Sequence, residues 1–172
     1  MEGVTIRDAT VQDARGIAEV HVAAWRWAYR DLMPDTVLEG LSIDDREARW
    51  REGFDGPRPG WGCLVAEDHG RIVGFVGYGP PEERTDTAGL GEVYAIYLDP
   101  SVVGSGVGRD LLERATERLR AAGWRRAFLW VLETNERARR FYERAGWSWD
   151  GTTSAHRFDC AELPIVRYAA DL

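Results

Sequence analysis

The stretch from Asp99 to Leu112, DPSVVGSGVGRDLL, decides the fold because it joins a buried strand to an amphipathic helix through alternating glycines. Residues 93–98 before it form a short apolar run, which predicts a buried strand. After it, apolar residues recur at helical spacing over residues 108–122. Glycines allow a close backbone approach, and a helix start directs free N–H groups outward. The loop therefore predicts a phosphate or pyrophosphate site, with a flexible connection as the alternative.

The segments around this loop predict an α/β architecture. A second apolar run at residues 127–132 follows the helix, and a strand, a helix and a strand of this kind form a right-handed crossover between parallel strands. Upstream, Asp68-His69-Gly70 is a hairpin signal. We therefore expect a mixed central sheet, with antiparallel early strands and a parallel middle pair, flanked by helices in one domain over residues 1–172.

The remaining elements follow from capping residues and periodicity. Thr10, with Asp13 three residues later, predicts the start of a helix that runs to about Tyr29. The other expected strands are residues 4–7, 63–67, 72–78, 147–153 and 165–169, and the other expected helices are residues 42–50 and 138–145, with a polar loop at Pro80 to Gly89.

Composition narrows the function. The 172 residues are 44% hydrophobic and carry a net charge of −7, which argues against a broad nucleic-acid-binding surface. No apolar run approaches the ~20 residues that span a bilayer, and no secretion signal is recognisable. Cys63 and Cys160 lack metal-ligand spacing, so we expect no metal site, structural thiols and a cytoplasmic protein. All 22 basic residues are arginine.

Two phosphate-binding motifs compete for the glycine loop. A P-loop requires Gly-Lys-Ser/Thr, and the chain has no lysine. A dinucleotide fingerprint requires a third glycine where Arg109 stands. Glu133, near the end of the next strand, stands where a ribose-binding acid could lie, so the dinucleotide hypothesis stays open.

The same stretch resembles the acetyl-CoA-binding segment of GNAT-superfamily N-acetyltransferases. That motif is Gln or Arg, two residues, Gly, one residue, then Gly or Ala. Gly106 and Gly108 match its last two positions, whereas Val103 replaces the Gln or Arg. By this resemblance, backbone amides along the loop bind the pyrophosphate, and Val103 alters the affinity without abolishing it. The residues implied are Val103, Gly104, Ser105, Gly106, Val107, Gly108 and Arg109.

A second segment, Asn135 to Trp147, is similar to the family's next conserved stretch: Asn, two residues, Ala, two residues, an aromatic, Tyr, three residues, Gly, an aromatic. Together the two segments cover residues 92–149. The resemblance implies a bacterial enzyme that transfers an acetyl group from acetyl-CoA directly to a primary amine of a small molecule, peptide or protein.

The resemblance also implies roles for single residues. Tyr142 would be the general acid near the CoA sulfur, the alternative being a core tyrosine. Glu92 would be a base, often acting through water, the alternative being a solvated residue at the strand start. Strand alternation puts Glu92, Tyr94 and Ile96 on one face, so Tyr94 could help position the amine.

Further roles concern cofactor and acceptor binding. The resemblance implies that the main chain of Ile96, Tyr97 and Leu98 meets the pantetheine arm. Asn135 would contact the cofactor, and it also fits a plain N-cap. Trp25 and Tyr29 border the expected acceptor site, although core packing explains them equally well.

Two other functions remain open at this stage. A GNAT-like domain could bind acyl-CoA as a non-catalytic sensor, a reading that Val103 favours and Tyr142 disfavours. A dinucleotide-binding domain is the third hypothesis. The identity of the acceptor lies in variable loops outside the matched segments, and the formation of a homodimer is equally open.

Overall fold

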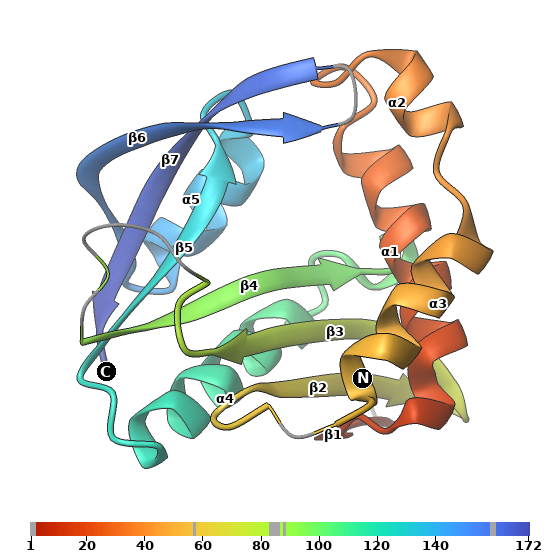
Figure 1. Ribbon diagram of the computed structural model, residues 1–172, viewed down its shortest axis with the longest axis horizontal. Coiled ribbons are helices and arrows are strands. Elements are labelled where there is room, and N and C mark those ends of the chain that lie inside the picture. Colours follow the sequence, from red (N-terminus) through yellow and green to blue (C-terminus); the bar gives the residue numbers. More distant parts are fainter. Residues whose placement is uncertain (1–2, 57, 83–86, 88, 159–160) are drawn as a thin grey trace.

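A computed structural model describes residues 3–56, 58–82, 87, 89–158 and 161–172 (Figure 1). Cys160 and half of the loop expected at Pro80 to Gly89 lie outside the described residues. The helices are α1 (Ala14–Ala28), α2 (Asp35–Glu39), α3 (Ile43–Phe54), α4 (Val107–Ala121) and α5 (Glu136–Arg144), with 3-10 turns at Val11–Asp13 and Pro100–Val102. The strands are β1 (Val4–Asp8), β2 (Gly62–Asp68), β3 (Arg71–Gly79), β4 (Leu90–Leu98), β5 (Arg126–Leu132), β6 (Ser148–Phe158) and β7 (Ala161–Asp171).

The described strands form one mixed sheet in the order β1-β2-β3-β4-β5-β7-β6. Neighbours from β1 to β4 pair antiparallel, β4 and β5 pair parallel, and β7 pairs antiparallel with both β5 and β6. The predicted mixed α/β fold is therefore confirmed. The last two strands are longer than expected, because the hairpin of β6 and β7 extends well beyond the apolar residues that mark them in the sequence.

The parallel pair separates soon after it forms. Its register covers only Leu90 to Glu92 on β4, opposite residues 126–128 on β5. Beyond Glu92, β4 continues along β3 as far as Leu98, while β5 continues along β7 as far as Leu132. Figure 1 shows the two strands diverging toward their carboxyl ends. The sheet is therefore split at its centre, and the split opens beside the glycine loop.

Helices cover both faces of the sheet. On one face, Leu111, Leu112 and Ala115 of α4 and Tyr142 of α5 join a core cluster with residues of β2 to β5 and β7. On the other face, α1 packs on β2 and β3 through Ile17 and Val20. A further cluster joins the end of α1 and α2 to Leu132 of β5 and Ile165 of β7, so apolar packing bridges the split on this face.

A β-bulge in β4 corrects one prediction. The register passes from Gly77 opposite Ala95 to Tyr78 opposite Val93, which leaves Tyr94 as the extra residue. As a result Val93 and Ile96, three residues apart, both pack on the α4 face, whereas Tyr97 packs on the α1 face. The expectation that Ile96 shares a face with Glu92 and Tyr94 is therefore wrong, because an extra residue reverses the alternation beyond it.

The predicted capping box stabilises the start of α1. The Asp13 carboxylate accepts hydrogen bonds from the Thr10 backbone N–H at 2.8 Å and from the Arg7 guanidinium at 2.8 Å. Arg7 also donates to Glu67 of β2, so this network ties the helix to the sheet edge. The hydrogen bonds from Arg7, with others from Thr10, lower the pKa of Asp13 to about 2 despite its burial.

We expect Asp13→Asn to lower the free energy of unfolding at pH 7 by about 1–2 kcal/mol. A carboxyl whose pKa is lowered on folding stabilises the protein above its unfolded pKa, and this contribution disappears as pH falls toward 2. The difference between wild type and variant should therefore shrink below about pH 4, as measured by urea denaturation across pH. The exposed Glu117→Gln on α4 is the control. A difference independent of pH would contradict this account.

Candidate functional site

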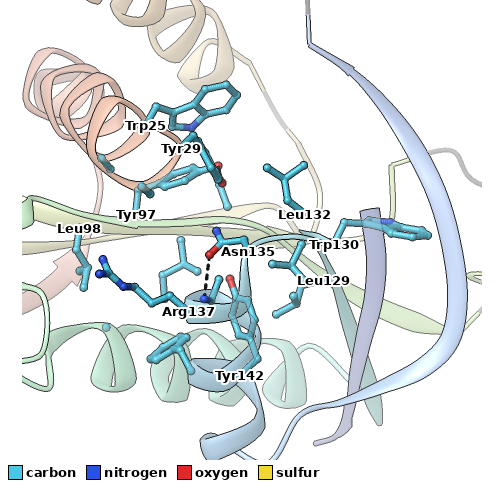
Figure 2. A pocket seen from close by; sticks show the side chains of 18 of the residues that line it. Trp25, Tyr29, Tyr97, Leu98, Leu129, Trp130, Leu132, Asn135, Arg137 and Tyr142 are labelled. Atoms are coloured by element: carbon cyan, nitrogen blue, oxygen red, sulfur yellow. Dashed lines mark hydrogen bonds between the residues drawn. The ribbon is translucent and has the colours of Figure 1, made fainter. Parts of the chain in front are cut away.

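A cavity of about 1340 Å³ occupies the split between β4 and β5. Its walls come from the end of α1, the inner edges of β4 and β5, the glycine loop and the start of α5. Figure 2 shows side chains from α1 and β4 on one side of this space and side chains from β5 and α5 on the other. The volume exceeds the ~300–1,000 Å³ of an ordinary small-molecule pocket, which leaves room for two ligands side by side.

The glycine loop forms one end of the cavity. Gly104 and Gly106 have φ of +84° and +100°, a region that side chains rarely adopt, and Gly106 caps α4. The Ser105 hydroxyl donates to the Val102 carbonyl at 2.6 Å and closes the loop. The buried Val107 anchors it in the core. The N–H groups of the first turn of α4 have no acceptor within the helix, so they can meet an anion.

The backbone N–H of Val103, which we expected to face the pyrophosphate, has a partner within the chain. Its backbone N–H donates to the Pro100 carbonyl at 3.4 Å, within the 3-10 turn, and its side chain is exposed. The amide that we expected Val103 to supply is thus already used inside the chain. Arg109 lies at the cavity wall, and its guanidinium pairs with Glu113 at 2.7 Å.

The end of β4 presents main chain to the cavity. The side chains of Ile96 and Leu98 pack on the α4 face, and Tyr97 packs on the α1 face. The edge of β4 that faces β5 has no β5 partner beyond Glu92. Backbone groups on this edge therefore lack a β5 partner, and the contact of Ile96, Tyr97 and Leu98 with the cofactor that the resemblance implies stays a prediction.

Two residues of the second matched segment reach the cavity from α5. Asn135 is buried and caps the helix, its side-chain oxygen accepting from the Ala138 N–H at 3.1 Å (Figure 2). The predicted N-cap is confirmed. Tyr142 is buried at the cavity wall, and burial raises the pKa of its hydroxyl, with a smaller contribution from Tyr97. The Tyr142 hydroxyl therefore keeps its proton at neutral pH.

Glu92 lies where β4 and β5 part. It is 5% exposed, which excludes the alternative of a solvated residue, and β4 begins at Leu90, three residues before the expected strand. Its carboxylate accepts a hydrogen bond from the Glu82 N–H at 2.9 Å and lines the cavity. Tyr94 also lines the cavity, but its hydroxyl donates to the Pro80 carbonyl. The proton of the Tyr94 hydroxyl is thus already donated within the chain.

Aromatic side chains form the α1 side of the cavity. The hydroxyls of Tyr29 and Tyr97 lie 3.4 Å apart, and the rings of Trp25 and Tyr29 meet edge to face. Trp25 and Tyr29 belong to the core cluster that bridges the split, and both line the cavity. The core role is therefore confirmed, and the acceptor-side role of the same two residues stays a prediction.

Other cavity residues were missed by sequence reasoning. They include Arg46 and Arg49 of α3, Trp130 and Leu132 of β5, and Arg137 of α5. For β5, strand alternation over residues 127–132 could have predicted which side chains share a face, because Trp130 and Leu132 lie on the opposite face of the sheet from Leu129. For Arg46 and Arg49 the sequence contains no comparable signal.

Cys63 behaves as the inert thiol expected of it. It is buried, its Sγ donates to the Leu64 carbonyl at 3.8 Å, and burial raises its pKa to about 12. Within the described ranges, no group of three or more His, Cys, Asp or Glu side chains is arranged to hold a metal ion. No helix among those residues is long and apolar enough to cross a membrane.

Comparison with known proteins identifies the family to which this chain belongs. The model of the acetyltransferase (GNAT) family matches residues 19–147. The chain belongs to the GNAT family. An N-acetyltransferase of Bacillus subtilis, YuaI, is 37% identical over 134 residues, covering 77% of this chain and 73% of the relative. The GNAT homologues make this chain an N-acetyltransferase of bacterial type.

One further sequence relative and one solved structure are similar to this GNAT protein. A mycothiol acetyltransferase of Propionibacterium freudenreichii is 42% identical over 109 residues, covering 63% of this chain but only 33% of the relative. The PaiA N-acetyltransferase of Thermoplasma acidophilum, solved in complex with coenzyme A, has a TM-score of 0.74 at 18% identity over 98% of this chain and 99% of that one. The latter likeness shows the shared fold.

We expect Gly106→Ala to weaken CoA binding by about tenfold, because a side chain at φ +100° costs roughly 1–2 kcal/mol and distorts the loop. Gly123→Ala is a matched control, since Gly123 follows α4 with φ +97° and lies outside the cavity wall. Both variants should lose thermal stability, whereas only Gly106→Ala should raise the CoA Kd in calorimetry. Equal effects of the two variants on Kd would contradict a direct role for the loop.

Proposed function

We propose that this GNAT protein transfers an acetyl group from acetyl-CoA directly to a primary amine of a small molecule, peptide or protein. The observation that carries the proposal is the split between β4 and β5, which opens at the glycine loop. An extended thioester fits along the free edge of β4, with its pyrophosphate at the first turn of α4. The coenzyme A and acetyl-CoA complexes of GNAT proteins with the same fold support this cofactor.

The reaction requires a neutral amine. A lysine-type amine, with pKa ~10.4, is almost wholly protonated at pH 7, so a proton acceptor accelerates the attack. Glu92 is the carboxylate that we assign to this role, directly or through water, since it is buried at the apex of the split and lines the cavity. The amine nitrogen then forms a bond to the acetyl carbon, and the proton passes to Glu92.

Collapse of the tetrahedral intermediate breaks the bond between carbon and sulfur. The leaving thiolate is stabilised by a hydroxyl that is still protonated, and burial keeps the Tyr142 hydroxyl in that form. Tyr142 donates its proton to the sulfur and is reprotonated from solvent, and Glu92 releases to solvent the proton that it accepted. The buried thiol of Cys63 lies outside the cavity wall, so it is not placed to carry a covalent acetyl group.

A thermal-shift comparison tests the cofactor. Acetyl-CoA or CoA at ~100 times its Kd should add about 2.7 kcal/mol and raise Tm by roughly 5–10 °C. NAD should give no shift. A shift with NAD alone would favour the dinucleotide hypothesis, whereas tight CoA binding without turnover over a broad panel of amines would favour the non-catalytic sensor.

We expect Tyr142→Phe to lower kcat by about 10²–10⁴-fold while leaving the Kd of CoA within about twofold. Tyr168→Phe is the matched control, because its buried hydroxyl binds Glu143 at 2.8 Å and does not line the cavity. The control should change stability and leave kcat unchanged. A normal kcat in Tyr142→Phe would remove Tyr142 as the acid.

The companion variant Glu92→Gln separates the base from the acid. Its loss of kcat/KM should be largest for amines of high pKa and smallest for weakly basic amines, which are already neutral at the assay pH. Tyr142→Phe should affect both kinds of amine equally. An equal loss for all amines in Glu92→Gln would assign the carboxylate to a structural role instead.

A further inference from the structure

One buried side chain of the cavity has no use in the mechanism above. His21 of α1 is 9% exposed and lines the cavity. Its ring stacks on Tyr97, with centroids 5.0 Å apart and planes at 18°, and also contacts Trp25 and Phe75. Within the described residues, neither Nδ1 nor Nε2 has a hydrogen-bond partner. A buried polar group in this condition is costly unless a ligand or water satisfies it.

The protonation state of His21 limits its role. Burial, with smaller contributions from the positive charges of Arg46 and Arg49, lowers its pKa to about 3. The imidazole is therefore neutral at physiological pH and too weak a base to accept a proton from an amine. It still offers one N–H donor and one acceptor nitrogen at the cavity wall.

Two arginines complete this corner of the cavity. Arg46 and Arg49 come from α3, which packs beside α1 on the face opposite α4, and both line the cavity. The Arg46 guanidinium carbon lies 5.2 Å from the ring centroid of Trp25, so this charge rests against the aromatic wall. Because α4 packs on the other face of the sheet, we assign these charges to the acceptor side rather than to the pyrophosphate site.

The charges on the acceptor side are divided between two regions. Glu92 lies at the apex of the split, and Glu82 donates its backbone N–H to it. The arginines lie on α3 instead, and the apolar and aromatic groups of Tyr29, Trp130 and Leu132 line the same cavity. Such a cavity suits a ligand with an amine at one point and an anionic group at another.

We propose that the acceptor is a small primary amine that also carries an anionic oxygen group, a carboxylate or a phosphonate, and that Arg46, Arg49 and His21 hold that group. Guanidinium groups bind such oxygens in pairs of hydrogen bonds, and the neutral imidazole adds an uncharged donor. The inference rests on the proposed acetyl transfer, because it assigns the substrate class of the same site.

The test measures CoA release with sets of amines that differ only in the anionic group. One set is L-phenylalanine, its 1-aminophosphonate analogue and 2-phenylethylamine, and the corresponding sets for the other amino acids complete the panel. Values of kcat/KM are compared per neutral amine, because the three amines differ in pKa. At least one carboxylate or phosphonate member should exceed its uncharged partner by about tenfold or more. The favoured member decides between the two anionic groups.

Variants test the residues. Arg49→Gln and Arg46→Gln should lower kcat/KM for the anionic acceptor by about tenfold and leave the uncharged amine within about twofold. Arg51→Gln, on the same helix but paired with Glu47 and outside the cavity wall, should change neither. His21→Phe keeps a ring against Tyr97 and removes both nitrogens, so it should also lose the preference. If it fails to fold, the Arg49→Gln comparison still decides, since Arg49 is exposed.

The outcomes separate this inference from the proposed function. Turnover that favours uncharged amines in wild type, or an equal loss for both acceptor types in Arg49→Gln and Arg46→Gln, overturns the anionic acceptor and leaves acetyl transfer intact. Binding of acetyl-CoA with no turnover of any amine overturns the proposed function itself. If wild type prefers anionic acceptors and only the variants at Arg46, Arg49 and His21 lose that preference, the result supports both the anionic acceptor and the proposed acetyl transfer.

Discussion

The site depends on the short pairing between β4 and β5. Three residues on each strand form the parallel register, and beyond Glu92 each strand keeps only its outer partner. Backbone groups that lose a sheet partner must be satisfied by water or by a ligand. The hydrogen-bonded pairing between β4 and β5 is therefore incomplete at the centre of the sheet. The apolar cluster between α1, α2, β5 and β7 keeps the split from closing or widening on one face, and α4 and α5 support the other.

The placement of charge follows from the same split. Glu92 is buried at the apex because its strand is still paired there on both sides, whereas the glycine loop is exposed because the strand has ended. The protein thus keeps a carboxylate and a tyrosine hydroxyl in a buried part of the cavity and leaves the first backbone amides of α4 at its exposed end. Within one cavity, the two groups that could transfer protons, Glu92 and Tyr142, are therefore buried, and the loop amides are exposed.

The order of residues along the chain was enough to predict most of the helices and strands that surround the cavity. The capping box at Thr10, the hairpin at Asp68-His69-Gly70 and the helix after the glycine loop depend on neighbours in the chain, and each appears in the structure. The faces of β4 could not be predicted, because the extra residue at Tyr94 is defined by its partner strand. His21, Arg46 and Arg49 were missed for a related reason: two helices of separate sequence must pack together before these side chains meet one cavity.

The bulge at Tyr94 has a consequence for how this chain tolerates insertions and deletions. Tyr94 has no partner on β3, while Val93 lies opposite Tyr78 and Ala95 lies opposite Gly77. Deletion of Tyr94 would therefore keep every other pairing, and Ile96 and Tyr97 would stay on their present faces. The loss would be local, namely the Tyr94 ring and the hydrogen bond from its hydroxyl to the Pro80 carbonyl. A second deletion would have no unpaired residue to absorb it, and the side chains beyond it would move to the opposite face of the sheet.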